Sequence, residues 1–117
     1  SHLRTYRIQV NPKVLANPPS GAAMVAILMH ELKHVMDYSQ MNTSELIEFG
    51  IWYGSADIAE YERQTDLFTL EKGCGTGLIA FRNWLYGQVT DEVKAEKQRQ
   101  YYTPEEIQQW MDEQSAP

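Results

Sequence analysis

The clearest chemical pattern in the sequence is His30-Glu31-Leu32-Lys33-His34, in which two histidines surround a glutamate. On an α-helix, residues four apart lie on the same face, about 6 Å apart along the axis, so both imidazoles can bind one Zn²⁺. Glu31 lies about 100° round the helix from His30, a position that suits a general base acting on a water molecule beside the ion. The pattern therefore predicts a zinc site with His30 and His34 as ligands and Glu31 as the catalytic base.

A third ligand is expected, because a catalytic zinc usually has three protein ligands and an open fourth position. The remaining histidine, His2, lies at the very start of the chain, so a carboxylate further along is the better candidate. Residues 60–66 contain two glutamates, and only Glu62 has a second carboxylate, Asp66, one helical turn further on. We expect Glu62 to be the third ligand and Asp66 to accept the outer N–H of a ligand histidine. Glu60 is the alternative ligand.

The His30 and His34 pair and the Glu62 and Asp66 pair each require a helix, and the sequence predicts a helix for each. Apolar residues recur every three or four positions between Ser20, a helix-capping residue, and Tyr38. A second helix is expected from about Ala56 to Lys72, where Gly73 ends it. Four shorter helices are expected to begin near Thr43 or Ser44, after Gly77, after Thr90 and after Thr103. The histidine pair thus lies on one helix and the glutamate on another.

One strand is predicted at the start of the chain, from Tyr6 to Asn11. Tyr6, Ile8 and Val10 alternate there with polar residues, as in a strand with one buried face. No repeat and no linker divides the sequence, so residues 1–117 are expected to form a single domain. The predicted fold is α+β and mostly α-helical, with an active-site helix, a glutamate helix and one N-terminal strand.

Composition excludes several classes of protein. The 16 acidic and 10 basic residues give a net charge of −6, which is the wrong sign for a nucleic-acid surface. The longest apolar run, from Ala22 to Met29, falls far short of the roughly 20 residues that cross a bilayer, so no membrane span is expected. The single cysteine, Cys74, excludes an internal disulfide. The start at Ser1 without a methionine and the acidic charge favour a secreted or periplasmic location over a cytoplasmic one.

The sequence resembles the gluzincin branch of the zincin metallopeptidases. The resemblance rests on residues 30–34 followed by Glu62 and Asp66, and it covers the chain from about Ala22 to Leu70. The 27 residues between the two motifs and the small Thr65 before Asp66 look like HtpX and the CAAX-prenyl endopeptidases. The small size is similar to that of soluble minimal gluzincins.

This resemblance implies a zinc-dependent endopeptidase that cleaves peptide bonds with a zinc-activated water. It implies His30, His34 and Glu62 as the zinc ligands and Glu31 as the base. It also implies that the strand from Tyr6 to Asn11 pairs with an extended peptide substrate, a mode of binding known from other proteins.

Two features of the sequence depart from the family and leave alternatives open. Only one strand is evident, where zincins usually have a larger sheet, and no downstream histidine is present to stabilise a tetrahedral intermediate. Five other residues are candidates for that role: Tyr53, Tyr61, Tyr86, Arg63 and Arg82.

The small size also fits a latent enzyme, with the segment from Thr103 folded over the site, or a non-catalytic, zinc-stabilised module that binds a peptide or protein. The intact Glu31 favours the enzyme, because a structural site needs no base.

Overall fold

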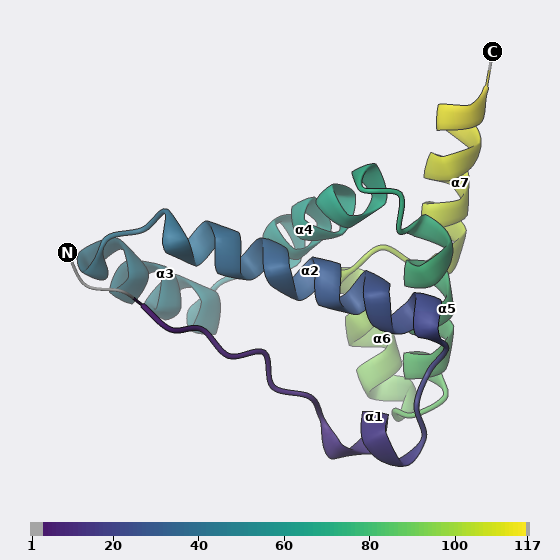
Figure 1. The fold of residues 1–117 in the computed structure, drawn as a ribbon, viewed down its shortest axis with the longest axis horizontal. Helices are drawn as coiled ribbons and strands as arrows, with labels where there is room; N and C mark the ends of the chain where they lie inside the picture. Colours follow the sequence, from purple (N-terminus) through teal and green to yellow (C-terminus); the bar gives the residue numbers. More distant parts are fainter. Residues whose placement is uncertain (1–3, 117) are drawn as a thin grey trace.

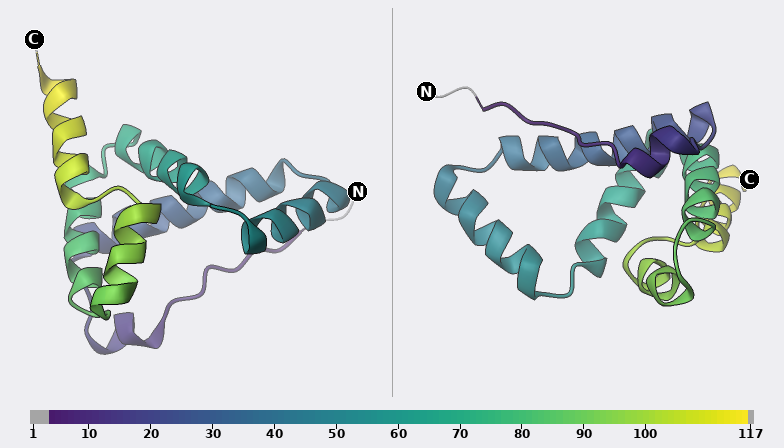
Figure 2. Two further views of the ribbon diagram at one scale, coloured as in Figure 1. Left: turned by 180° about the vertical axis from the view of Figure 1, so that it is seen from behind. Right: turned by 90° about the horizontal axis from the view of Figure 1, so that it is seen from below.

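The structure is a computed structural model that describes residues 4–116. These residues form seven α-helices: α1 (Pro12–Ala16), α2 (Gly21–Ser39), α3 (Thr43–Ser55), α4 (Ala59–Glu71), α5 (Gly75–Tyr86), α6 (Asp91–Gln100) and α7 (Pro104–Ser115). Helix α2 spans most of the molecule (Figure 1). Helix α5 crosses it near its first turns, and α4 packs against its middle (Figures 1 and 2).

The predicted α+β fold is wrong, because residues 4–116 contain no strand. The segment from Tyr6 to Asn11 is extended, as its alternating pattern indicates, but a strand also needs a neighbouring backbone with which to form a hydrogen-bond ladder. No second extended segment lies beside it within the described residues. Instead the segment runs along α2 in the opposite direction (Figure 1), and Arg4 Nη1 donates to the Tyr38 carbonyl at the far end of that helix, at 3.0 Å.

The helix boundaries follow the capping residues in the sequence. Helix α2 begins directly after Ser20, whose hydroxyl accepts a hydrogen bond from the Ala23 N–H at 3.2 Å. Helix α7 begins with a capping box between Thr103 and Glu106. Helix α4 ends before Gly73, whose φ of 85° lies in the left-handed region that favours glycine. The predicted helices of the metal motif are therefore confirmed, α4 beginning three residues later than expected.

The apolar core is small and lies where α2, α4, α5 and α7 meet. Ala26, Leu70, Leu78 and Ile107, one from each of these helices, form its centre. Small residues bring α2 and α5 close together, since Ala26 is fully buried and faces Gly77 of α5. Ile107 is also fully buried, so α7 is part of the core.

Gly77 is expected to be required for this close contact. A Cβ at residue 77 would collide with the Ala22 carbonyl of α2 and press on the Ala26 side chain, and backbone cannot move aside easily. We expect Gly77→Ala to lower the free energy of unfolding by about 1–3 kcal/mol, measured by urea denaturation. Gly54→Ala is the control, because a Cβ there meets no atom within 4 Å. An unchanged midpoint for Gly77→Ala would contradict this account of the packing.

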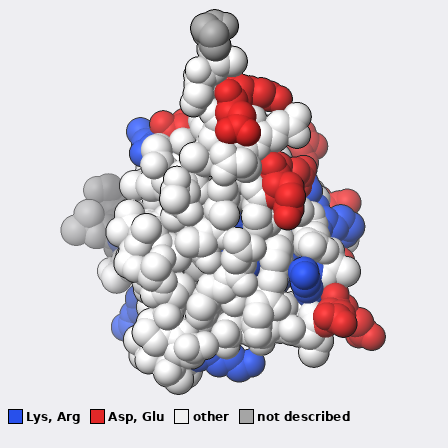
Figure 3. Space-filling view, turned by 90° about the vertical axis from the view of Figure 1, so that its right-hand side faces the viewer, with Lys and Arg blue, Asp and Glu red and all other residues white. Residues whose placement is uncertain are grey.

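On the face that carries α5 and α7, acidic side chains gather toward the top and right, a few lysines and arginines lie near the edge, and most of the rest is uncharged (Figure 3). No helix within residues 4–116 combines the length and the hydropathy needed to cross a membrane.

Candidate metal centre

Three buried side chains from two helices converge on one point. The His30 Nε2 and His34 Nε2 atoms, both from α2, are 3.2 Å apart. Glu62, from α4, places Oε2 at 3.2 Å from His30 Nε2 and Oε1 at 3.2 Å from His34 Nε2. Ligand atoms round a tetrahedral zinc, each about 2.0–2.1 Å from the ion, lie about 3.3 Å from one another. The arrangement therefore fits a zinc ion held by these three residues.

Asp66 holds the outer nitrogen of His30. The His30 Nδ1–H donates to Asp66 Oδ1 at 2.8 Å, which leaves Nε2 directed at the metal position. Asp66 is fully buried and accepts two further donors. Arg82 Nη2 lies 2.6 Å from each of its oxygens, and the Tyr102 backbone N–H donates at 3.0 Å. The Arg82 guanidinium thereby neutralises a carboxylate that is enclosed in the protein.

A second chain of hydrogen bonds holds His34. Its Nδ1–H donates to the Tyr61 hydroxyl at 2.9 Å, and that hydroxyl donates to Asp37 Oδ2 at 3.0 Å. Lys33 forms an ion pair with the same Asp37. The sequence reasoning missed this role of Asp37 and Tyr61. One signal was present, because Asp37 follows His34 by three residues and so lies on the same side of the helix.

We expect Tyr61→Phe to weaken zinc binding about tenfold. The ring contacts would remain, but the His34 Nδ1–H would lose its acceptor, and the imidazole would be less well oriented. Competition with a chromophoric chelator measures the affinity. Tyr38→Phe is the matched control, since the Tyr38 ring stacks on the same imidazole at 6.2 Å between centroids but takes no part in this chain of hydrogen bonds. Equal losses in both variants would contradict the role of the hydroxyl.

The electrostatics of the cluster favour positive charge. Burial lowers the pKa of His30, but the hydrogen bonds with Asp66 and Glu62 outweigh it and raise the pKa to about 9. Burial alone would raise the pKa of Glu62, yet the two histidines hold it well below the usual range. The pKa of Asp66 is also lowered, because His30 and Arg82 outweigh its burial. Two buried carboxylates are therefore kept ionised beside the place where a cation would bind.

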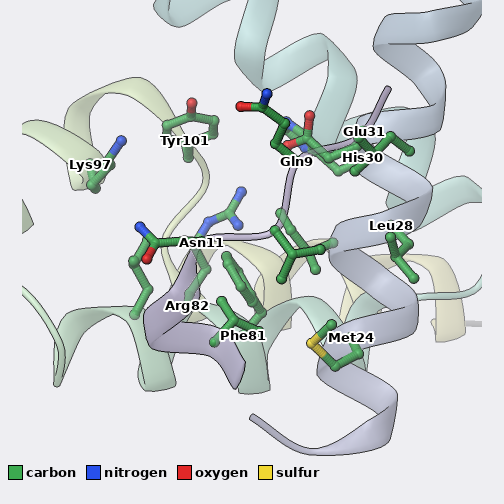
Figure 4. A pocket seen from close by; sticks show the side chains of 15 residues that line it. Gln9, Asn11, Met24, Leu28, His30, Glu31, Phe81, Arg82, Lys97 and Tyr101 are labelled. Atoms are coloured by element: carbon green, nitrogen blue, oxygen red, sulfur yellow. The ribbon is translucent and has the colours of Figure 1, made fainter. Parts of the chain in front are cut away.

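Glu31 lines a cavity that reaches His30, one of the three residues of the cluster. The cavity has a volume of about 270 Å³ and is lined by His30 and Glu31 together with apolar side chains such as Leu28 and Phe81. Figure 4 shows His30 and Glu31 side by side at one end of it, with Gln9 of the extended segment close by. Glu31 is only partly buried, so water can reach its carboxylate. The structure thus places the sequence-predicted base next to His30 and open to this cavity.

Of the five candidates for stabilising a tetrahedral intermediate, Tyr53 is the one whose hydroxyl contacts the proposed ligand Glu62. Its hydroxyl lies 3.4 Å from Glu62 Oε1, and burial, together with the Glu62 charge, raises its pKa to about 12. Tyr61 is hydrogen-bonded to His34, and Arg82 is hydrogen-bonded to Asp66 and also lines the cavity that contains Glu31. Arg63 is ion-paired with Glu106 at 2.9 Å. The fifth, Tyr86, has a buried hydroxyl without a partner among residues 4–116.

Tyr101 is a neighbour of the cluster that the sequence did not indicate. Its ring centroid lies 5.8 Å from that of His30, and burial together with the Glu62 carboxylate raises its pKa. Tyr101 follows α6 in an irregular segment, where no periodic pattern marks a residue as inward-facing. The alternative ligand Glu60 is exposed and lies outside the cluster. His2 lies outside the described residues.

Comparison with protein-family models, with curated proteins and with solved structures finds no match for this chain.

Proposed function

We propose that the chain is a zinc-dependent endopeptidase. The observation that carries the proposal is that His30 Nε2 and His34 Nε2 lie 3.2 Å apart and each has one Glu62 carboxylate oxygen at 3.2 Å, with Glu31 beside them on an open cavity. Structural zinc sites are usually closed by four protein ligands. Three ligands, a neighbouring carboxylate and access to water support a hydrolytic site instead.

Each residue has a defined task in this proposal. When bound, zinc supplies Lewis acidity toward a water molecule and toward the carbonyl of the scissile bond. Glu31 accepts the proton of the attacking water and later delivers it to the leaving amine. Asp66 and Tyr61 keep the two imidazoles in the orientation that binds the metal. The Tyr53 hydroxyl is the candidate donor to the oxygen that becomes negatively charged.

The extended segment beside α2 supports a peptide as the substrate. Residues 4–10 lie outside any helix or sheet, so their backbone groups are available to an extended peptide, as in strand addition. Ile8, Gln9 and Val10 line the same cavity as His30 and Glu31. A peptide between this segment and α2 would pass beside His30 and Glu31, which line that cavity.

A second candidate function is a non-catalytic, zinc-stabilised binding module. The small core favours it: the buried apolar side chains are Ala23, Ala26, Leu70, Leu78, Phe81 and Ile107. Bound zinc would then supply much of the stability that a larger apolar core provides elsewhere.

Hydrolysis of a quenched-fluorescent peptide library by zinc-loaded protein distinguishes the two functions. We expect cleavage that stops on addition of a chelator and returns with zinc. One zinc per chain with no cleavage of any peptide would overturn the endopeptidase and favour the binding module.

A further inference from the structure

A second cavity lies at the other end of the metal cluster, between α2 and α3. It has a volume of about 260 Å³ and is lined by Tyr38, Leu46, Phe49, Gly50 and Tyr53. Two of the side chains that line it contact proposed zinc ligands. The Tyr38 ring stacks on His34 with an interplanar angle of 14°, and the Tyr53 hydroxyl lies 3.4 Å from Glu62 Oε1. One layer of side chains, Tyr38 and Tyr53, therefore separates this cavity from His34 and Glu62.

Gly50 keeps this cavity open. Glycine is among the least favourable residues inside a helix, and Gly50 stands in the middle of α3. Its backbone does not require glycine, because among the described residues only Gly73 has a positive φ. Packing does not require it either, since a Cβ at Gly50 would meet no atom within 4 Å. What the missing side chain does provide is free space in the lining of the cavity.

The walls indicate what would fill that space. Helix α3 contains no buried residue and contacts the rest of the protein through aromatic rings. Phe49 lies 5.7 Å from Tyr38 and 5.1 Å from Tyr61, between ring centroids. Aromatic rings pack well against another ring in an offset or edge-to-face arrangement. The volume is below the range of about 300–1,000 Å³ that holds a drug-sized ligand, so it suits a single side chain.

The two cavities lie at a spacing that one extended peptide can bridge. Leu28 of α2 lines the first cavity and Tyr38 of the same helix lines the second. Ten residues of helix separate them by about 15 Å, which an extended peptide covers in about four to five residues. His30 and His34 lie between these two residues along the helix.

We propose that the cavity around Gly50 binds an aromatic side chain of the peptide substrate, close to the bond that is cleaved. This inference rests on the proposed endopeptidase function and names the substrate class: peptides with an aromatic residue near the scissile bond.

Binding to a non-hydrolysing variant tests the cavity apart from the activity. The probe is the peptide N-acetyl-Gly-Gly-Phe-Gly-Gly-amide, compared with the same peptide carrying Ala in place of Phe, and both are titrated into zinc-loaded Glu31→Gln protein. We expect the Phe peptide to bind at least about tenfold more tightly. Adding Gly50→Leu should reduce that ratio to less than about twofold, because leucine would fill the cavity.

Gly54→Leu is the matched control. It makes the same substitution four residues along α3, also where a Cβ meets no atom within 4 Å, but Gly54 does not line the cavity. Both leucines improve the helix propensity of α3, so both variants should fold and bind one zinc. The control should keep the tenfold preference for the Phe peptide.

The possible results separate the cavity from the activity. No preference in Glu31→Gln protein, a preference that survives Gly50→Leu, or equal losses in both leucine variants would overturn the aromatic site. A preference that only Gly50→Leu removes supports it. Digestion of the peptide library by the unchanged chain tests the enzyme separately. A binding preference without cleavage of any library peptide supports the aromatic site and refutes the endopeptidase. Cleavage without any binding preference refutes the aromatic site and supports the endopeptidase.

Discussion

Glu31→Gln is expected to bind one zinc per chain and to hydrolyse peptides about 10²–10⁴ times more slowly than the unchanged chain. Glutamine has the same shape as glutamate but cannot accept a proton from the attacking water. The ligand atoms of His30, His34 and Glu62 are not altered, so zinc affinity should stay within a few-fold. The measurements are kcat and KM on a cleaved library peptide, with zinc content determined by metal analysis. The loss should fall on kcat.

Glu60→Gln is the control for this substitution. Glu60 is exposed on α4, two residues before the proposed ligand Glu62. Its replacement by glutamine removes one negative charge, as Glu31→Gln does. It should leave both zinc content and kcat unchanged. A Glu31→Gln protein that cleaves at the original rate would remove Glu31 from the mechanism. Loss of zinc from Glu60→Gln would instead reopen the choice of the third ligand.

The parts of the site that the sequence predicted are those in which local helical geometry determines the distances. The spacing of four between His30 and His34, and of four between Glu62 and Asp66, fixes each pair on one helix face. The capping residues at Ser20 and Thr103 mark where helices begin. These relations depend on neighbours in the sequence, so one sequence was enough to find them.

The parts that could not be predicted depend on contacts between distant segments. Arg82 reaches Asp66 from α5, and the Tyr102 N–H reaches the same carboxylate from the segment before α7. Neither residue belongs to a motif. The strand prediction failed for a related reason: alternation of Tyr6, Ile8 and Val10 describes an extended chain, but pairing depends on whether another extended segment lies beside it.

Asp66→Asn is expected to destabilise the fold as well as weaken zinc binding. Asp66 is fully buried, and Arg82 is only 2% exposed. Asparagine would leave the Arg82 guanidinium without a countercharge inside the protein, which typically costs about 3–5 kcal/mol. The His30 Nδ1–H would face a weaker, neutral acceptor, so zinc affinity should fall about 10- to 100-fold.

Two measurements separate these effects. Urea denaturation of metal-free protein reports the change in folding stability without zinc, and chelator competition reports the zinc affinity. The exposed pair of Asp57 and Arg99, 3.0 Å apart, provides the control, because Asp57→Asn at the surface should leave the unfolding midpoint unchanged.

A second substitution tests whether the uncompensated charge is the cause. Adding Arg82→Met to Asp66→Asn removes the charge but keeps an apolar side chain of suitable length, so the double variant should be more stable than Asp66→Asn alone. Its zinc affinity should remain low, since the acceptor for His30 is still weakened. A double variant no more stable than the single one would mean that Asp66 acts through packing rather than through Arg82. Restored zinc affinity would mean that Asp66 positions His30 only by way of the guanidinium.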